Sequence, residues 1–127
     1  MQGLARNFMI LGVLSVIIGM GWGIQMSASG DHSLAPAHAH LNLLGWVSCA
    51  IFAFYYHLVP AAAQGLLARL QFGAAALGLV TIVPGIVMAL TQQGETLAKI
   101  GSVLSFLSIL FFAAVVLRGG ARAGATG

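Results

Sequence analysis

Charged residues are almost missing from this sequence. Of its 127 residues only 6% are charged, with five Lys or Arg and two Asp or Glu. A soluble domain carries about a quarter charged residues, so too little polar surface is present to cover a water-exposed globule. By contrast, 60% of the residues are hydrophobic and the mean hydropathy is +1.02. This composition indicates a protein of the lipid bilayer.

Two further shortages exclude classes of chemistry. Cys49 is the only cysteine, so an intrachain disulfide and a two-cysteine metal site are excluded. Asp31 and Glu95 are the only acids, and both fall in predicted loops, so a carboxylate chain for proton pumping is absent from the predicted spans. The sequence also has no serine–histidine–acid set and no glycine-rich phosphate loop. The few basic residues are scattered at the ends of apolar runs, which argues against a nucleic-acid partner.

The apolar residues fall into four runs, each close to the roughly 20 residues that a bilayer-spanning helix needs. We therefore predict an all-α membrane protein, with a single domain over residues 1–127 that forms a four-helix transmembrane bundle. The expected helices cover residues 8–26, 36–59, 66–90 and 97–117. Seventeen glycines suit close helix packing in lipid, and Gly12, Gly19 and Gly23 are predicted to form a packing face on the first helix.

The basic residues predict the orientation of the bundle. Arg6, Arg69, Arg118 and Arg122 fall on one side, and only Lys99 falls on the other. The positive-inside rule then places both termini in the cytoplasm, an N-in/C-in topology in a bacterial inner membrane. The first run also fits a cleaved signal peptide, with a small-residue site near residues 27–29. Its apolar stretch exceeds the about 7–15 residues of a signal core, which favours a retained helix.

Four histidines stand out in a chain with so few charges. His32, His38 and His40 lie at the outer end of the second helix or just before it, on the side predicted to face the periplasm or exterior. His57 lies at the inner end of that helix. His32 is expected to be a solvated loop residue. His57 lies beside two tyrosines and is expected to anchor the helix at the interface, where aromatic residues are common.

His38 and His40 are the candidate cofactor and metal ligands. Ionisable side chains inside a membrane usually face a cavity, a partner or a bound group. On a regular helix at about 100° per residue the two are about 200° apart, so they cannot grip the same ion. His40 and His57 are separated by about 25 Å along the axis, at about 1.5 Å per residue, and belong to opposite membrane faces.

Other candidate ligands lie at the same outer end. Met26 ends the first helix there, Met88 nears the outer end of the third, and Met20 lies about two turns below Met26. Histidine and methionine together suit either a haem iron or a copper site. Asn42 and Trp46 can hydrogen-bond a haem propionate or a histidine, and they can equally serve helix packing. Cys49 is interpreted as a buried inert thiol.

Two segments of the second helix resemble a known family. Residues 37–46 read AHAHLNLLGW and residues 55–60 read YYHLVP. These resemble helix II of haem-copper oxidase subunit I, in its nitric oxide reductase and C-family branches. By that resemblance His40 matches the histidine that ligates low-spin haem b, and a one-residue difference in spacing leaves His38 as an alternative. The likeness covers about 25 residues.

The resemblance implies a haem b-binding membrane protein that acts in electron transfer or in redox or gas sensing. The third and fourth predicted helices contain no histidine, so a complete haem-copper catalytic centre is not expected in this chain alone. A homo-oligomer would supply the second axial ligand, and a respiratory-chain protein would be the redox partner. The alternatives are a copper-handling protein with a periplasmic His/Met site and a cofactor-free assembly subunit of a respiratory complex.

Overall fold

Helices make up nearly all of the computed structural model, which describes residues 1–125, with side chains as far as Gly119. No strand occurs in that part of the chain. The elements in chain order are α1 (Gly3–Ser29), α2 (Ala35–His40), the π-helical segment η1 (Leu41–Val47), α3 (Ser48–Leu58), the 3-10 segment η2 (Pro60–Gln64), α4 (Leu66–Leu90) and α5 (Thr96–Ala125). The side chain of Arg122, counted above among the basic residues, lies outside the described part.

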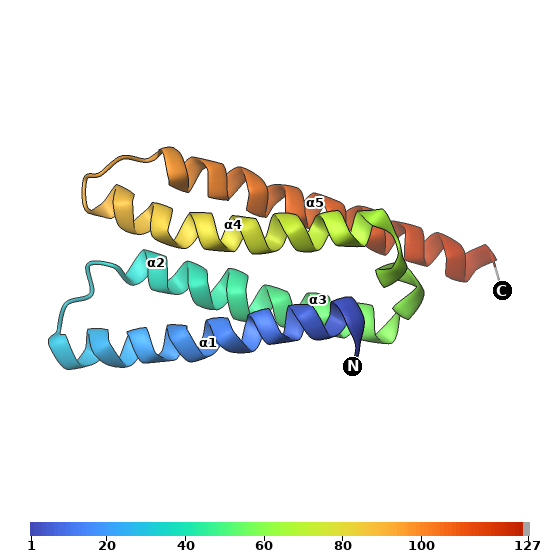
Figure 1. The fold of residues 1–127 in the computed structure, drawn as a ribbon, viewed down its shortest axis with the longest axis horizontal. Helices are drawn as coiled ribbons and strands as arrows, with labels where there is room; N and C mark the ends of the chain where they lie inside the picture. Colours follow the sequence, from blue (N-terminus) through green and yellow to red (C-terminus); the bar gives the residue numbers. More distant parts are fainter. Residues whose placement is uncertain (126–127) are drawn as a thin grey trace.

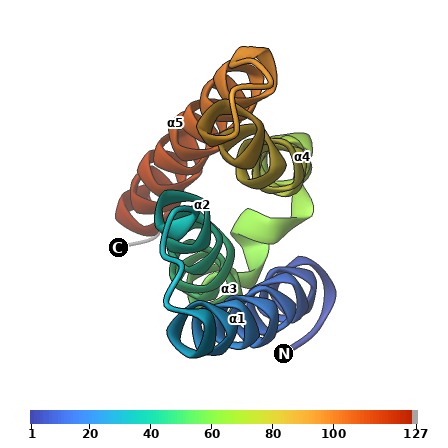
Figure 2. The ribbon, with the colours of Figure 1, turned by 90° about the vertical axis from the view of Figure 1, so that its left-hand side faces the viewer.

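The helices form two hairpins that lie side by side (Figures 1 and 2). The first hairpin pairs α1 with the continuous helix α2–η1–α3, and the second pairs α4 with α5. The loops after α1 and after α4 lie together at one end, which we call the loop end. The N-terminus and η2 lie toward the opposite end, which we call the terminal end, and α5 runs past them to the C-terminus (Figure 1).

The four-helix fold class is confirmed. Four helices are long and apolar enough to cross a membrane: Gly3–Ser29, Ala35–Leu58, Leu66–Leu90 and Thr96–Gly119. The third matches the predicted range of 66–90. The first and fourth extend beyond the predicted ranges of 8–26 and 97–117, because a helix continues past the apolar run into the interfacial region of the bilayer. Large apolar side chains are exposed along all four helices, as expected of surfaces that face lipid.

The second span differs from the regular helix predicted over residues 36–59. Its middle third is π-helical, and the Ser48 N–H bonds the carbonyl of Leu43, five residues earlier. The wider turn changes the angular register of α3 relative to α2. π-Helical turns inside α-helices are rare and frequent at functional sites, which makes this segment notable. Pro36 lies in the first turn of α2, as predicted.

The largest buried side chains gather in the terminal half of the bundle. The Phe8 ring lies 5.2 Å from the Phe52 ring and 4.8 Å from the Phe72 ring, measured between centroids. Phe112 of α5 adds to the cluster at 4.7 Å from Phe52. Edge-to-face aromatic pairs are worth about 0.5–1.5 kcal/mol beyond the area that they bury. This cluster therefore joins α1, α3, α4 and α5 at one end of the molecule.

Close backbone contact holds the second hairpin together. A Cβ added at Gly101 of α5 would lie 2.5 Å from the Ile82 Cα of α4, and one added at Gly85 would meet the backbone of Ala98. Such contacts allow the two helices to approach without intervening side chains, which is the common packing mode in membranes. Pro84 precedes the contact at Gly85, and α4 continues through it to Leu90.

Gly101→Ala tests this packing. We expect it to lower the free energy of unfolding by about 1–3 kcal/mol, because the added methyl group overpacks the contact with Ile82. Gly73→Ala is the matched control, since a Cβ there meets nothing within 4 Å. Denaturant titration in micelles measures both variants. Equal stability of the two would contradict the close approach of α4 and α5.

Candidate functional site

Three glycines of α1 pack against polar and aromatic side chains of the second span. A Cβ added at Gly12 would lie 3.3 Å from the Trp46 ring, and one added at Gly23 would lie 3.1 Å from Cε1 of His38. Gly19 lies against the Asn42 amide in the same way. The predicted packing face of Gly12, Gly19 and Gly23 is thus confirmed. Without these glycines the imidazole and amide of the second span could not approach α1 so closely.

His38 is half-buried between the two helices of the first hairpin. Its ring lies edge-to-face with Trp22, at 6.2 Å between centroids. The Asn42 Nδ2 donates to the His38 carbonyl at 3.0 Å and lies 3.3 Å from Nδ1 and 3.4 Å from Nε2 of the ring. Nδ2 of Asn42 is thus within hydrogen-bond distance of both ring nitrogens of His38.

An open groove runs along His38 toward the loop end. Its volume is about 580 Å³, and it is lined by residues of α1 together with His38, Ala39, Asn42 and Leu43. Met20 and Ser27 are the α1 residues with a sulfur or a hydroxyl in this lining. Binding sites for small molecules and cofactors have volumes of about 300–1,000 Å³ and carry a few polar groups on apolar walls. The groove has a volume in this range and a similar lining, and it is open along one side.

His40 does not line the groove. Its Nδ1 lies 2.7 Å from the carbonyl oxygen of Pro36. Since a carbonyl oxygen only accepts hydrogen bonds, Nδ1 carries the proton, and the lone pair of the neutral ring is on Nε2. Metal-bound histidines usually have their other ring nitrogen fixed in this way. His38 and His40 thus face different surroundings, as their angular separation predicts.

The other predicted site residues are not gathered around one imidazole. Met26 is buried near the end of α1, and Met88 is half-buried near the end of α4, and neither lines the groove. Trp46 packs on Gly12, about two turns of α1 away from Gly19. Cys49 is 1% exposed and bonds the Leu44 carbonyl, which fits an inert thiol. Among residues 1–125, no three His, Cys, Asp or Glu side chains come together as a metal site.

The loop between α1 and α2 is built from local hydrogen bonds. Gly30 takes a positive φ of 71°, which ends α1 with its N–H bonded to the Met26 carbonyl. The Ser33 N–H donates to the Asp31 carboxylate at 3.0 Å, and this bond lowers the pKa of Asp31. His32 is exposed and bonds the Gly30 carbonyl through Nδ1. Asp31 and His32 therefore form an exposed polar loop.

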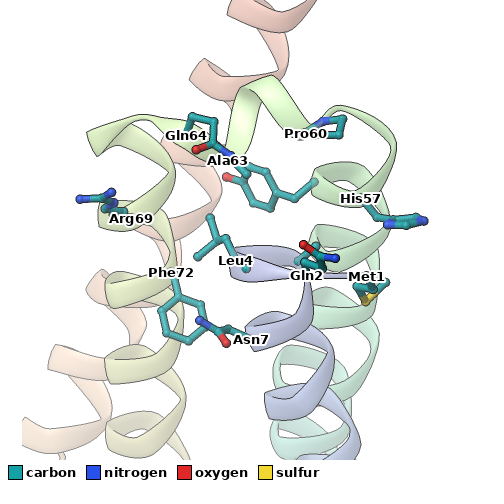
Figure 3. Close-up of a pocket in the computed structure, with 13 residues that line it drawn as sticks. Met1, Gln2, Leu4, Asn7, His57, Pro60, Ala63, Gln64, Arg69 and Phe72 are labelled. Atoms are coloured by element: carbon teal, nitrogen blue, oxygen red, sulfur yellow. The ribbon is translucent and has the colours of Figure 1, made fainter.

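A second hollow lies far from these histidines, at the terminal end (Figure 3). It has a volume of about 780 Å³ between the start of α1, the end of α3, η2 and the start of α4. Figure 3 shows that His57 and Arg69 line it but point outward on opposite sides, while Gln2, Leu4 and Asn7 lie between them. Exposed His57 at this edge fits the interfacial position predicted for it.

A buried polar chain beneath this hollow was not predicted from the sequence. The Tyr56 hydroxyl donates to Oε1 of Gln71 at 3.0 Å, and Nε2 of Gln71 donates to Oγ of Ser108 at 3.2 Å. The three residues are 0–3% exposed and come from α3, α4 and α5. The signal in the sequence was Gln71, a lone amide within an apolar run, since an unpaired amide in lipid costs several kcal/mol.

Two separate clusters of buried or half-buried polar side chains are thus present in the described part of the chain. One is the histidine groove at the loop end, and the other is the Tyr56–Gln71–Ser108 chain toward the terminal end. Comparison with protein families, with curated proteins and with solved structures finds no match for the chain.

A double-mutant cycle tests the buried chain. Tyr56→Phe leaves the Gln71 amide oxygen unpaired, and we expect it to lower the free energy of unfolding by about 0.6–2 kcal/mol, the range of hydrogen bonds between membrane helices. Combined with Gln71→Leu, it should show a coupling of similar size. Tyr55→Phe is the control and should not couple to Gln71→Leu. Coupling energies to Gln71→Leu that are equal for Tyr55→Phe and Tyr56→Phe would contradict the hydrogen bond between Tyr56 and Gln71.

Proposed function

We propose that this chain is a haem b-binding membrane protein that acts in electron transfer or in redox or gas sensing. The proposal rests on the groove at the loop end, where His38 and Met20 line the same open groove of about 580 Å³. Imidazole and thioether are the side chains that ligate haem iron in b- and c-type cytochromes. When bound, haem b supplies a one-electron couple inside the bilayer.

The residues of the groove fit such a group. His38 is held edge-on by Trp22 and rests on Gly23, so its ring is oriented by its neighbours. Asn42 and Ser27 offer the polar contacts that a propionate needs, and Ala39, Leu43 and Ile24 supply apolar walls. Orientation of a ligand by surrounding residues is what maintains a metal site, because a loose imidazole binds weakly. The geometry favours His38 as the ligand from this chain.

His40 is the ligand that the family resemblance favours. Its protonated Nδ1 is bonded to Pro36, which leaves Nε2 as the metal-binding atom. His38 and His40 do not converge, so a second copy of the chain would supply the second axial ligand of a haem bound at either histidine. Closed symmetric homo-oligomers are the common assembly of such chains. Met20 in the groove is an alternative second ligand within one chain.

The orientation proposed for the groove rests on charge. Arg6, Arg69 and Arg118 are exposed toward the terminal end. At the loop end Lys99 lies 3.5 Å from Glu95, so its charge is locally balanced, and Asp31 adds a negative charge. The positive-inside rule then places the terminal end in the cytoplasm and the histidine groove toward the periplasm of a bacterial inner membrane. A periplasmic or respiratory-chain redox protein would reach the groove from that side.

A copper site is the second candidate function. The shared lining of Met20 and His38 favours it, because Cu(I) prefers thioether and imidazole ligands. Copper without iron in the purified protein would support this function instead. A colourless, metal-free protein that co-purifies with an oxidase would indicate an assembly subunit.

Three histidine variants test the haem proposal. We expect His38→Ala to abolish or strongly shift the Soret band of the protein purified with adequate haem supply, because it removes the imidazole of the groove. His57→Ala is the matched control and should leave the band unchanged, since His57 is exposed at the other end. Loss of the band in His40→Ala, but not in His38→Ala, would indicate that His40 is the iron ligand, as the resemblance implies. An unchanged band in both His38→Ala and His40→Ala would contradict a haem site at this end.

Cysteine accessibility tests the orientation. In a Cys49→Ala background, we expect Ser33→Cys to react with a membrane-impermeant maleimide added to intact spheroplasts, because Ser33 is exposed in the loop end. Gln64→Cys, exposed at the terminal end, should react only after the membrane is opened. The reverse pattern of labelling would show that the groove faces the cytoplasm.

A further inference from the structure

A small cavity lies between the two hairpins, away from the histidine groove. Ser48 and Phe52 of α3 line it from one side, and Ser105 and Ser108 of α5 line it from the other. The volume that the centre of a water molecule can occupy in it is about 20 Å³. A single bound water needs about 10–15 Å³ by that measure, together with two to four polar partners. The cavity is therefore large enough for one water molecule, and its lining includes three hydroxyl groups that could bond that water.

Ser105 carries a buried hydroxyl without a partner. Its Oγ is inaccessible to solvent and makes no hydrogen bond within the described part of the protein. Several hydroxyls in the membrane helices bond a carbonyl four residues earlier, as Ser102 does with Ala98 at 2.8 Å and Thr81 with Leu77 at 2.7 Å. Ser105 instead points toward α4, where a Cβ added at Gly78 would lie 2.8 Å from its Oγ. An unpaired buried hydroxyl is destabilising, which calls for a partner at this position.

Ser108 connects the cavity to the buried polar chain. Its Oγ accepts from Nε2 of Gln71, and Gln71 in turn accepts from Tyr56. A hydroxyl oxygen has two lone pairs, so Ser108 can also accept a hydrogen bond from a water in the cavity. Tyr56 lines the hollow at the terminal end. The hydroxyls and the amide thus run in sequence from that hollow to the cavity.

We propose that a water molecule binds in this cavity and donates or accepts hydrogen bonds with Ser105, Ser108 and Ser48. The bound water completes a polar path from the hollow at the terminal end to the middle of the span Thr96–Gly119, where Ser105 and Ser108 lie. It also bridges the two hairpins, because Ser48 belongs to the first and Ser105 and Ser108 to the second. This site is independent of the haem proposal, since none of its residues lines the histidine groove.

The direction in which Ser105→Ala changes the Tm tests whether a water molecule is bound in the cavity. If a water bonds Ser105, Ser105→Ala removes one of its partners, and we expect the Tm of the purified protein to fall by about 2–5 °C. If the cavity is empty, Ser105→Ala removes an unsatisfied polar group and the Tm stays the same or rises. Ser102→Ala is the control on the same helix, since its exposed hydroxyl bonds only Ala98. An unchanged or raised Tm for Ser105→Ala relative to Ser102→Ala overturns the proposal.

Hydroxyl-radical footprinting of the wild-type protein gives an independent result. Radicals generated from bound water modify adjacent side chains, so Phe52 should be labelled although it is only 4% exposed. Phe8 is the control, because it is buried, lies 5.2 Å from the Phe52 ring and does not line the cavity. Ser105→Ala should lower the labelling of Phe52 and not that of Phe8. Labelling of Phe52 at the level of Phe8 in the wild-type protein overturns the proposal.

Discussion

Close approach of α1 to the second span is the constraint on which the histidine groove depends. Polar side chains are costly in lipid, and they are tolerated where a helix surface accepts them. Gly19 and Gly23 provide that surface, since a side chain at either position would collide with Asn42 or crowd His38. The glycines do not bind anything themselves. They let the Asn42 amide and the His38 imidazole lie close to α1, and Met20, Gly23 and Ile24 line the groove beside them.

The two halves of the bundle are built differently. Toward the terminal end, aromatic rings and the Tyr56–Gln71–Ser108 chain join both hairpins through large buried side chains. Toward the loop end, contacts use glycine, alanine and backbone, and a groove of about 580 Å³ stays open to one side. The densely packed half therefore lies toward the terminal end, and the open groove lies in the other half. Between them the π-helical segment Leu41–Val47 changes the register of the second span.

The sequence was sufficient for the four spans, the packing face on α1 and the separation of His38 from His40, because these follow from hydropathy and from helical geometry. The extents of α1 and α5 were underestimated, since helices continue where hydropathy falls. The π-helical segment was not predicted because residues 41–47 carry no proline or charge to mark it. Gln71 was overlooked for a related reason: its partners Tyr56 and Ser108 are 15 and 37 residues away, and only the tertiary fold brings them together. Met20, rather than Met26 or Met88, lines the groove together with His38. Which methionine lies beside the imidazole depends on the fold and not on position in the chain alone.

The haem content of the wild-type protein tests the proposed binding of haem b. The protein would be expressed with haem supply, purified in detergent as a monodisperse species, and assayed as the pyridine haemochrome against protein concentration. We expect b-type haem in a fixed ratio to the chain, with one haem per chain or one per two chains if two copies share the iron. A folded, monodisperse protein that contains no haem would contradict it.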